Sequence, residues 1–241
     1  MNIYQKSFAG LMMLSIGLTT AFADSAFTGS YLGVGESATF NNFRYSHSPS
    51  SGGRNQDFKK TSTETSIYVG YGYEFKNNYY LGVESGFQYN FDRSLSNNEF
   101  NFPSDKWGNF YAGIAPQYSI YFDLTPGYAV TDNLLIYAIF GASYTQYRTN
   151  YGWQVSSWSK NKFASTDKVF MSSPAYSIAA RIGLGIKYKI TKHIVTKLTY
   201  IYSYGSPMSA SYWVDGSFLN YESQSIRPLS QSVMIGLAYQ F

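Results

Sequence analysis

Cysteine is absent from the 241 residues, and only two histidines are present. Without thiols the chain can form no disulfide framework, no thiolate metal site and no lipid anchor on an N-terminal cysteine. Charged residues make up only 13% of the chain, and the formal net charge of +4 is too small an excess to indicate a nucleic-acid partner. Beyond the N-terminal region, no apolar run is long enough for a transmembrane helix. An inner-membrane helix bundle is therefore excluded.

The N-terminal residues 1–23 are typical of a secretory signal peptide. Lys6 supplies the basic start, residues 8–18 form a short apolar core, and Ala21 and Ala23 make a small-x-small cleavage site. A transmembrane helix is the competing interpretation, but the apolar core is too short for one. We expect cleavage after Ala23 and export across the inner membrane.

Aromatic residues, in contrast, are abundant, with 25 Tyr and 18 Phe. In stretches such as SVMIGLAYQF and YSIAARIGLGIKYKI, apolar residues alternate with polar residues and glycine, which predicts strands with one apolar face. About eight such strands recur, each long enough to cross a bilayer when tilted. Short turns are expected near 76–78, 131–133 and 191–193, and long polar loops near 41–61, 92–117, 147–175 and 206–228.

This layout predicts an all-β fold over residues 24–241. We expect a closed eight-stranded antiparallel up-and-down transmembrane barrel with short periplasmic turns and long extracellular loops. Lipid-facing aromatics gather at both strand ends, as two membrane interfaces require. A β-sandwich would also alternate, but its polar face would meet water, and here that face is rich in glycine, which suits a narrow barrel interior.

Three stretches, YLGVESGFQYNF, FDLTPGYAVTDNLLIYAIFGASYTQYR and SVMIGLAYQF, resemble strands of small outer-membrane barrels of the outer-membrane protein A and opacity-protein type. The resemblance implies a place in the bacterial outer membrane, in contact with its lipid and lipopolysaccharide. It also implies the barrel assembly machinery as a partner during biogenesis, with Leu237, Tyr239 and Phe241 as the assembly signal. One departure is Ile139, where such proteins often carry an inward basic residue. Another is the lack of a peptidoglycan-binding domain after the barrel.

The alternation places four acids and four bases inside the barrel. They are Glu64, Glu74, Glu84, Asp123, Arg181, Lys187, Lys189 and Lys197. Buried charges need partners, so we expect a salt-bridge network that plugs the lumen, with Glu84, Asp123, Arg181 and Lys197 near its middle. An ion pathway along the same charges is the alternative. Glu36 falls on the lipid-facing side unless it lies at the rim or a bulge shifts the register.

Catalysis has little support in the sequence. His193 falls in a predicted turn and His47 in a Ser/Gly-rich loop, and neither has the nucleophile and orienting acid that a hydrolase needs. We therefore predict no enzyme activity, no cofactor and no metal site, and a lipid-modifying enzyme remains a distant alternative.

The loops are the expected working surface. Bases there can pair with lipopolysaccharide phosphates, or they can join nearby aromatics in contacting a host or environmental ligand. The candidate contacts are Arg148, Trp153, Trp158, Lys160, Lys162 and Trp213. The sequence thus predicts a surface structural protein whose loops mediate adhesion or ligand binding, with a narrow pore as the alternative.

Overall fold

The computed structural model describes residues 26–47, 54–91, 98–100, 109–159, 162–210 and 224–241. The predicted signal peptide, residues 1–23, lies outside them. The strands are β1 (Gly29–His47), β2 (Arg54–Glu74), β3 (Tyr79–Asn90), β4 (Asn98–Phe100), β5 (Asn109–Thr131), β6 (Leu134–Ser159), β7 (Lys162–Lys189), β8 (Ile194–Gly205), β9 (Met208–Ala210) and β10 (Gln224–Gln240). Within these segments, no helix is long and apolar enough to cross a membrane.

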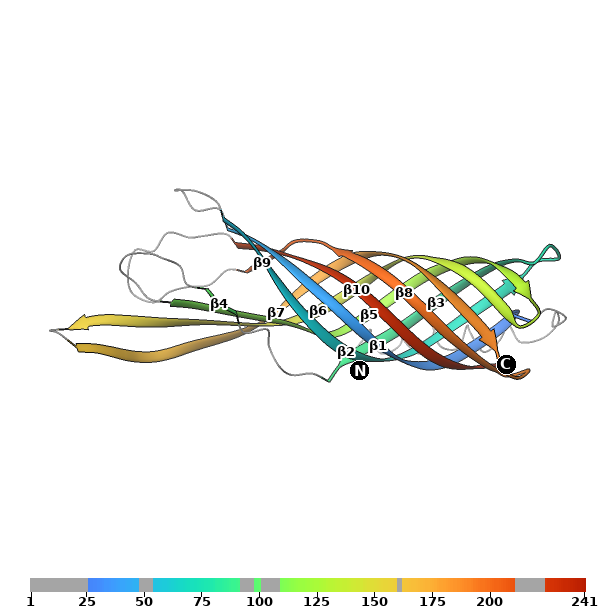
Figure 1. Cartoon of the computed structure of the whole chain (residues 1–241), viewed down its shortest axis with the longest axis horizontal. Coiled ribbons are helices and arrows are strands. Elements are labelled where there is room, and N and C mark those ends of the chain that lie inside the picture. Colours follow the sequence, from blue (N-terminus) through green and yellow to red (C-terminus); the bar gives the residue numbers. More distant parts are fainter. Residues whose placement is uncertain (1–25, 48–53, 92–97, 101–108, 160–161, 211–223) are drawn as a thin grey trace, which may run out of the picture.

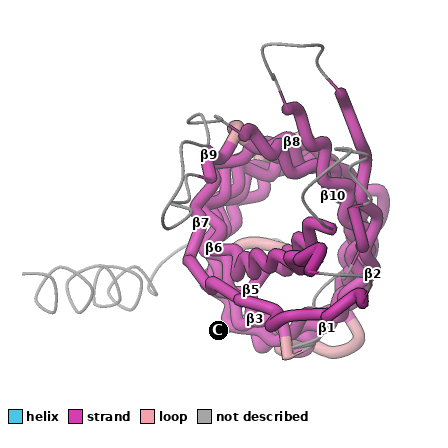
Figure 2. Tube along the Cα trace, turned by 90° about the vertical axis from the view of Figure 1, so that its left-hand side faces the viewer, coloured by secondary structure: helices cyan, strands magenta, loops and turns pink. Residues whose placement is uncertain are grey.

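Eight long strands form a closed antiparallel barrel, which confirms the predicted fold. They follow the order β1-β2-β3-β5-β6-β7-β8-β10, and β1 pairs with β10 to close the ring. Figure 2 looks along this ring from one end. The two three-residue strands are additions at one rim, where β4 pairs with β5 and β9 pairs with β10. Closure leaves the barrel wall without an unpaired edge.

The connections differ sharply between the two ends of the barrel. At one end, here called the turn end, short connections join β2 to β3, β5 to β6 and β7 to β8. At the other end, the hairpin end, the strands run well beyond the expected boundaries. The predicted loop 147–175 is wrong in this respect, because β6 continues to Ser159, β7 starts at Lys162, and the two form a hairpin that projects far from the barrel (Figure 1).

The other three predicted loops are also partly β-structure. β1 extends to His47 and β2 starts at Arg54, while β4, β9 and the first residues of β5 and β10 occupy the second and fourth predicted loops. A buried side chain such as Phe43 does occur in these extensions, but no lipid requires apolar residues at their outward positions, such as Arg44 and Lys59. The alternation therefore marks only the part of each strand that has an apolar outer face.

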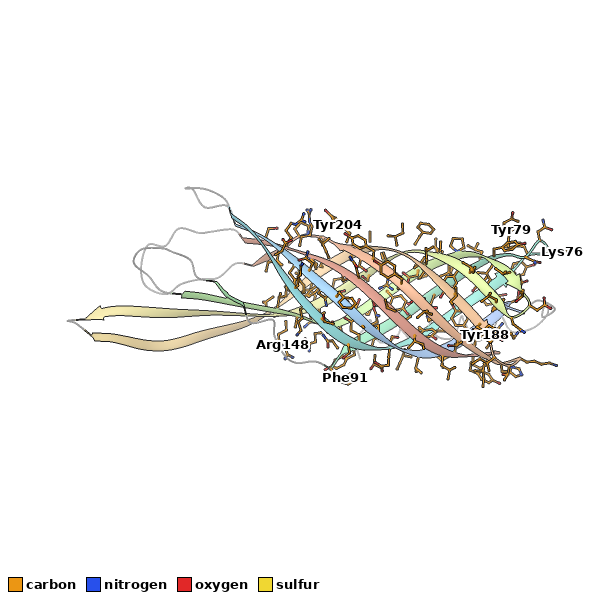
Figure 3. The ribbon with its side chains drawn as sticks, in the orientation of Figure 1. Lys76, Tyr79, Phe91, Arg148, Tyr188 and Tyr204 are labelled. Carbon is orange, nitrogen blue, oxygen red and sulfur yellow. The ribbon has the colours of Figure 1, made fainter. Side chains whose placement is uncertain are left out.

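The outer wall of the barrel is apolar, and aromatic residues concentrate near its two ends. Figure 3 places Tyr79 and Tyr188 near the turn end and Phe91 and Tyr204 near the hairpin end. Neighbouring rings pair across strands, as in Tyr79 and Tyr128, whose ring centroids are 5.7 Å apart. Aliphatic side chains fill the outer wall between these two aromatic girdles. They include Leu81, Val83, Ile120, Leu124, Ile136, Ile182, Leu184, Ile186, Leu198 and Ile235.

The inner wall combines tyrosines with glycines. A Cβ atom on Gly185 of β7 would lie 2.5 Å from Cζ of the Tyr137 ring on β6, and one on Gly86 of β3 would lie 2.6 Å from Cζ of Tyr121 on β5. The outer atoms of each ring therefore lie over a position that only glycine can occupy without displacing the ring. The glycine-rich inward face is the counterpart of the large tyrosines that fill the lumen.

Candidate functional site in the barrel interior

An acidic residue, Glu84 on β3, lies at the centre of the lumen. Its carboxylate accepts a 2.6 Å hydrogen bond from Lys197 Nζ on β8, with both side chains almost fully buried. The hydroxyls of Tyr31 and Tyr121 each donate to it at 3.0 Å. Lys197 Nζ also lies 3.3 Å from the centroid of the Tyr68 ring. The buried charge is thus matched by one cation and two hydroxyl donors, as burial requires.

A second ion pair lies next to the first. Arg181 on β7 donates from Nε and Nη2 to the two carboxylate oxygens of Asp123 on β5, at 3.0 and 3.1 Å. This bidentate geometry is the strong form of the Arg–carboxylate pair. The guanidinium also stacks on Tyr121, 4.4 Å from the ring centroid, and Tyr121 in turn donates to Glu84. The two ion pairs are therefore linked through one tyrosine.

Lys187 departs from the expected charge pairing. Its ammonium donates to the hydroxyls of Tyr31 and Tyr80, at 3.1 and 3.2 Å, and lies 4.2 Å from the centroid of the Tyr31 ring. The hydroxyl of Tyr31 in turn donates a hydrogen bond to the carboxylate of Glu84. We expected Lys187 to pair directly with an acid. Instead, the hydroxyl of Tyr31 lies between the ammonium of Lys187 and the carboxylate of Glu84.

The turn end of the lumen is closed by the N-terminal segment. Phe27 is buried with Leu135 and Tyr80 in an apolar cluster that also includes Ile139. Its backbone N–H donates to Glu74 at 3.2 Å, and Lys189 Nζ donates to the carbonyl of Ala26 at 2.5 Å. Glu74 and Lys189 thus hold the stopper formed by Ala26 and Phe27, rather than joining the central ion pairs.

The hairpin half of the lumen is polar and contains a cavity of about 50 Å³. A buried water needs roughly 10 to 15 Å³ of such space, so the cavity has room for only a few waters. Glu64, the remaining predicted acid, lines it and accepts a 3.4 Å hydrogen bond from the Ser62 hydroxyl. Hydroxyls, amides and Arg181 make up most of the remaining polar lining. The cavity is a small polar vestibule above the central ion pairs.

Several of the lumen groups described above were not singled out from the sequence. The alternation of the strands places Tyr80 and Tyr121 inside, but tyrosine is also the commonest girdle residue, so composition does not mark these rings as network members. Phe27 gave no signal at all, since it precedes the first regular strand. Ile139 does face inward and is buried, so the wall of β6 is apolar at the position noted as a departure.

The predicted surface contacts are placed only in part. Arg148 is half-buried on β6 near the rim (Figure 3). Trp153 and Trp158 belong to β6 and Lys162 to β7, in the projecting hairpin. Lys160 and Trp213 lie outside the described residues.

The proposed assembly residues and the two histidines lie at strand ends. Leu237, Tyr239 and Phe241 all point outward from the last strand and its end. His193 Nδ1 is 3.0 Å from the carbonyl oxygen of Gln240, and its ring stacks on Tyr239 at 5.4 Å. His47 ends β1. Across the described segments, no three His, Cys, Asp or Glu side chains come together in a way that could hold a metal ion.

A closed antiparallel barrel with an apolar outer wall, two aromatic girdles and a polar interior is a transmembrane β-barrel. Such a wall leaves no backbone group unsatisfied in lipid and exposes its aliphatic residues to hydrocarbon.

The chain belongs to the outer membrane protein beta-barrel domain family, whose model matches residues 7–241. The protein accordingly resides in the bacterial outer membrane, as its sequence predicted. No curated protein matches the chain.

Several solved structures are similar to the chain. The attachment invasion locus protein Ail of Yersinia pestis, solved with the heparin analogue sucrose octasulfate, is 14% identical over 89% of this chain and 99% of that chain, with a TM-score of 0.41. Neisserial surface protein A is 16% identical over 89% and 98%, with a TM-score of 0.41. OprG from Pseudomonas aeruginosa is 15% identical over 90% and 99%, with a TM-score of 0.49.

Proposed function

We propose that this outer-membrane barrel is a closed surface protein, which anchors and displays its hairpin-end segments rather than conducting solutes. We propose that the turn end of the barrel faces the periplasm and that the hairpin end faces the outside of the cell. The observation that carries the proposal is the filling of the lumen. Glu84 with Lys197 and Asp123 with Arg181 cross its middle, and Phe27 closes its turn end.

The packing of the interior argues against the pore alternative. The vestibule of about 50 Å³ ends at the central ion pairs, and the space beside Lys187 and Phe27 on the other side amounts to only about 10 Å³. A hydrated ion would have to displace charged groups that already have partners, and breaking a buried ion pair costs about 3 to 5 kcal/mol.

No catalytic role is included in the proposal. His193 lies beside a backbone carbonyl and a tyrosine ring, without a nucleophile to activate. A lipid-modifying enzyme would need such a pair on the membrane side of the barrel.

The projecting β6–β7 hairpin supports the display function. The region 147–175 carries Arg148, Lys160, Lys162 and Lys168 against Asp167, and cations flanked by aromatics are suited to anionic partners such as sulfated polysaccharides or acidic cell surfaces. We assign adhesion or ligand binding to this segment and lipopolysaccharide contact to the bases nearer the rim.

Shortening the hairpin tests the display function. Tyr151 and Met171 face each other across it, so an Asn-Gly turn joining them would keep the barrel while removing the tip. We expect cells carrying this variant to lose binding to an immobilised sulfated polysaccharide, and Lys160→Gln with Lys162→Gln to weaken it. Unchanged binding in the shortened variant would overturn the adhesive role, with barrel insertion checked by protease protection.

A further inference from the structure

One charged residue lies on the membrane-facing wall. Glu36 on β1 is exposed and points outward, opposite the exposed Ile235 of β10. The exposed Val34 precedes it on the same face, and Phe40 follows four residues later. Four residues of a tilted strand span about 10 Å along the membrane normal, so the carboxylate lies well inside the apolar band. The register is regular here, and neither a bulge nor the rim accounts for its position.

The carboxylate is only partly satisfied. Thr65 Oγ1 on β2 donates a 2.6 Å hydrogen bond to Glu36 Oε1, which fixes the side chain against the wall. Acidic groups facing hydrocarbon are costly and are usually retained for a function. A carboxylate oxygen facing the acyl chains needs a hydrogen-bond donor from outside the barrel.

The outward face of the neighbouring strand β2 is polar from this point up to the rim, unlike most of the wall. Mid-strand positions elsewhere on the outer wall carry residues such as Phe122, Phe140 and Ile182. On β2 the exposed or half-exposed outward positions from Thr65 to Lys59 instead form a polar strip, which Glu36 of β1 joins at one end and Arg44 of β1 at the other, whereas Ala38 and Phe40 lie between them on β1. The strip consists of Glu36, Thr65, Thr63, Thr61, Lys59 and Arg44. The strip begins at the Glu36 carboxylate inside the apolar band, continues along the three threonine hydroxyls, and ends at the cations Lys59 and Arg44 near the rim.

The chemistry of the strip selects among lipids. Ester carbonyls near the headgroup of a glycerophospholipid are acceptors only and cannot donate to Glu36. An acyl chain that is amide-linked or carries a hydroxyl near its carbonyl does offer an N–H or O–H at this depth. The phosphates of such a lipid, nearer the membrane surface, would lie beside Lys59 and Arg44. Arg44 also has an exposed ion pair with Asp57, with Nε and Oδ1 3.7 Å apart. A phosphorylated glucosamine lipid with amide-linked hydroxyacyl chains combines both features.

We infer that the β1–β2 strip is a binding site for the lipid A portion of the outer leaflet, with Glu36 accepting a hydrogen bond from an acyl-chain hydroxyl or amide. Thr65 positions the carboxylate, and Lys59 and Arg44 hold the phosphate. This site rests on the lipopolysaccharide contact proposed above and is independent of the adhesive role of the hairpin. It ties one lipid to the seam where β1, β2 and β10 meet.

Lipid competition tests the site. The refolded chain is placed in nanodiscs containing lipid A and phosphatidylglycerol, both anionic, and the ratio of the two lipids retained after release is measured by native mass spectrometry. We expect enrichment of lipid A by the native chain and a loss of roughly threefold or more in Glu36→Leu, as membrane hydrogen bonds predict. Glu36→Gln keeps one oxygen acceptor and should fall between them.

A matched control uses another hydroxyl on the outer wall. Thr196 Oγ1 donates to the carbonyl of Gly236 at 3.0 Å, so Thr196→Val should leave the lipid ratio unchanged. Equal enrichment by the native chain and Glu36→Leu, or no enrichment by either, would overturn the assignment. High-yield disulfide dimers of Ala38→Cys in lipid A membranes would also overturn it, because a second copy of the chain would then cover the strip.

Discussion

Removing the cation from the Glu84–Lys197 pair should destabilise the barrel more than removing both charges. Lys197→Met leaves the carboxylate of Glu84 buried with two tyrosine donors but without its 2.6 Å ammonium partner. An uncompensated buried charge costs about 3 to 5 kcal/mol. The two tyrosine hydrogen bonds remain, so we expect a loss near the lower end of this range.

The double variant Glu84→Gln with Lys197→Met removes the charge that was left behind. The amide oxygen of the glutamine can accept from one of the two tyrosines, and its NH2 group can donate to the hydroxyl oxygen of the other. Stability should therefore return to within about 1 to 2 kcal/mol of the native chain, since well-packed neutral replacements of buried ion pairs are often tolerated. The expected coupling energy between the two sites is therefore about 2 kcal/mol or more.

Urea unfolding in lipid vesicles provides the assay, with the folded fraction read from electrophoretic mobility without heating. The exposed variant Lys76→Met serves as the control, because Lys76 lies in a turn outside the lumen (Figure 3), and should change the free energy of unfolding by less than about 0.5 kcal/mol. Additive effects of the two single substitutions would refute the reasoning, since they would mean that the charges do not stabilise each other.

Three further substitutions probe other parts of the account. Phe27→Ala should lower the free energy of unfolding by about 3 kcal/mol, because the ring is buried against Leu135 and Tyr80; an unchanged urea midpoint would contradict its role as a stopper. Gly185→Ala should cost about 1 to 3 kcal/mol in the same assay, since its Cβ would lie 2.5 Å from the Tyr137 ring, and the double variant with Tyr137→Leu should recover part of the loss. Phe241→Ser should leave refolded stability nearly unchanged, because the ring is exposed, but should reduce the amount of assembled barrel in outer-membrane fractions; normal assembly would contradict the proposed signal.

The barrel itself could be predicted from the sequence because lipid acts on every outward side chain. In segments such as 176–190, apolar residues occupy every second position because those side chains face lipid. The same alternation places Glu84, Asp123, Arg181 and Lys197 inside the barrel. Strand extent could not be predicted for the β6–β7 hairpin, which projects beyond the barrel (Figure 1), because the lipid that selects for an apolar face does not act there. Alternation therefore underestimated the strands at the hairpin end.

The partner of each inward charge could not be predicted in the same way. Glu84 and Lys197 are 113 residues apart, and their meeting depends on the stagger of the strands around the closed ring, which no local pattern encodes. The sequence also did not indicate that the hydroxyls of Tyr31 and Tyr80 accept hydrogen bonds from Lys187. Alternation places such a tyrosine inside, but it does not say which charged group its hydroxyl will contact, since that also depends on the stagger of the strands.

Single-channel recording of the refolded chain in a planar bilayer tests the closed lumen most directly. The account predicts no steady conductance from the native chain. It predicts measurable current only when the central charges and the ring that closes the turn end are removed together, in a variant that combines Glu84→Ala, Asp123→Ala, Arg181→Ala, Lys197→Ala and Phe27→Ala. Reproducible open steps from the native chain, with amplitudes changed by Glu84→Gln or Arg181→Gln, would contradict it and identify the barrel as a narrow pore.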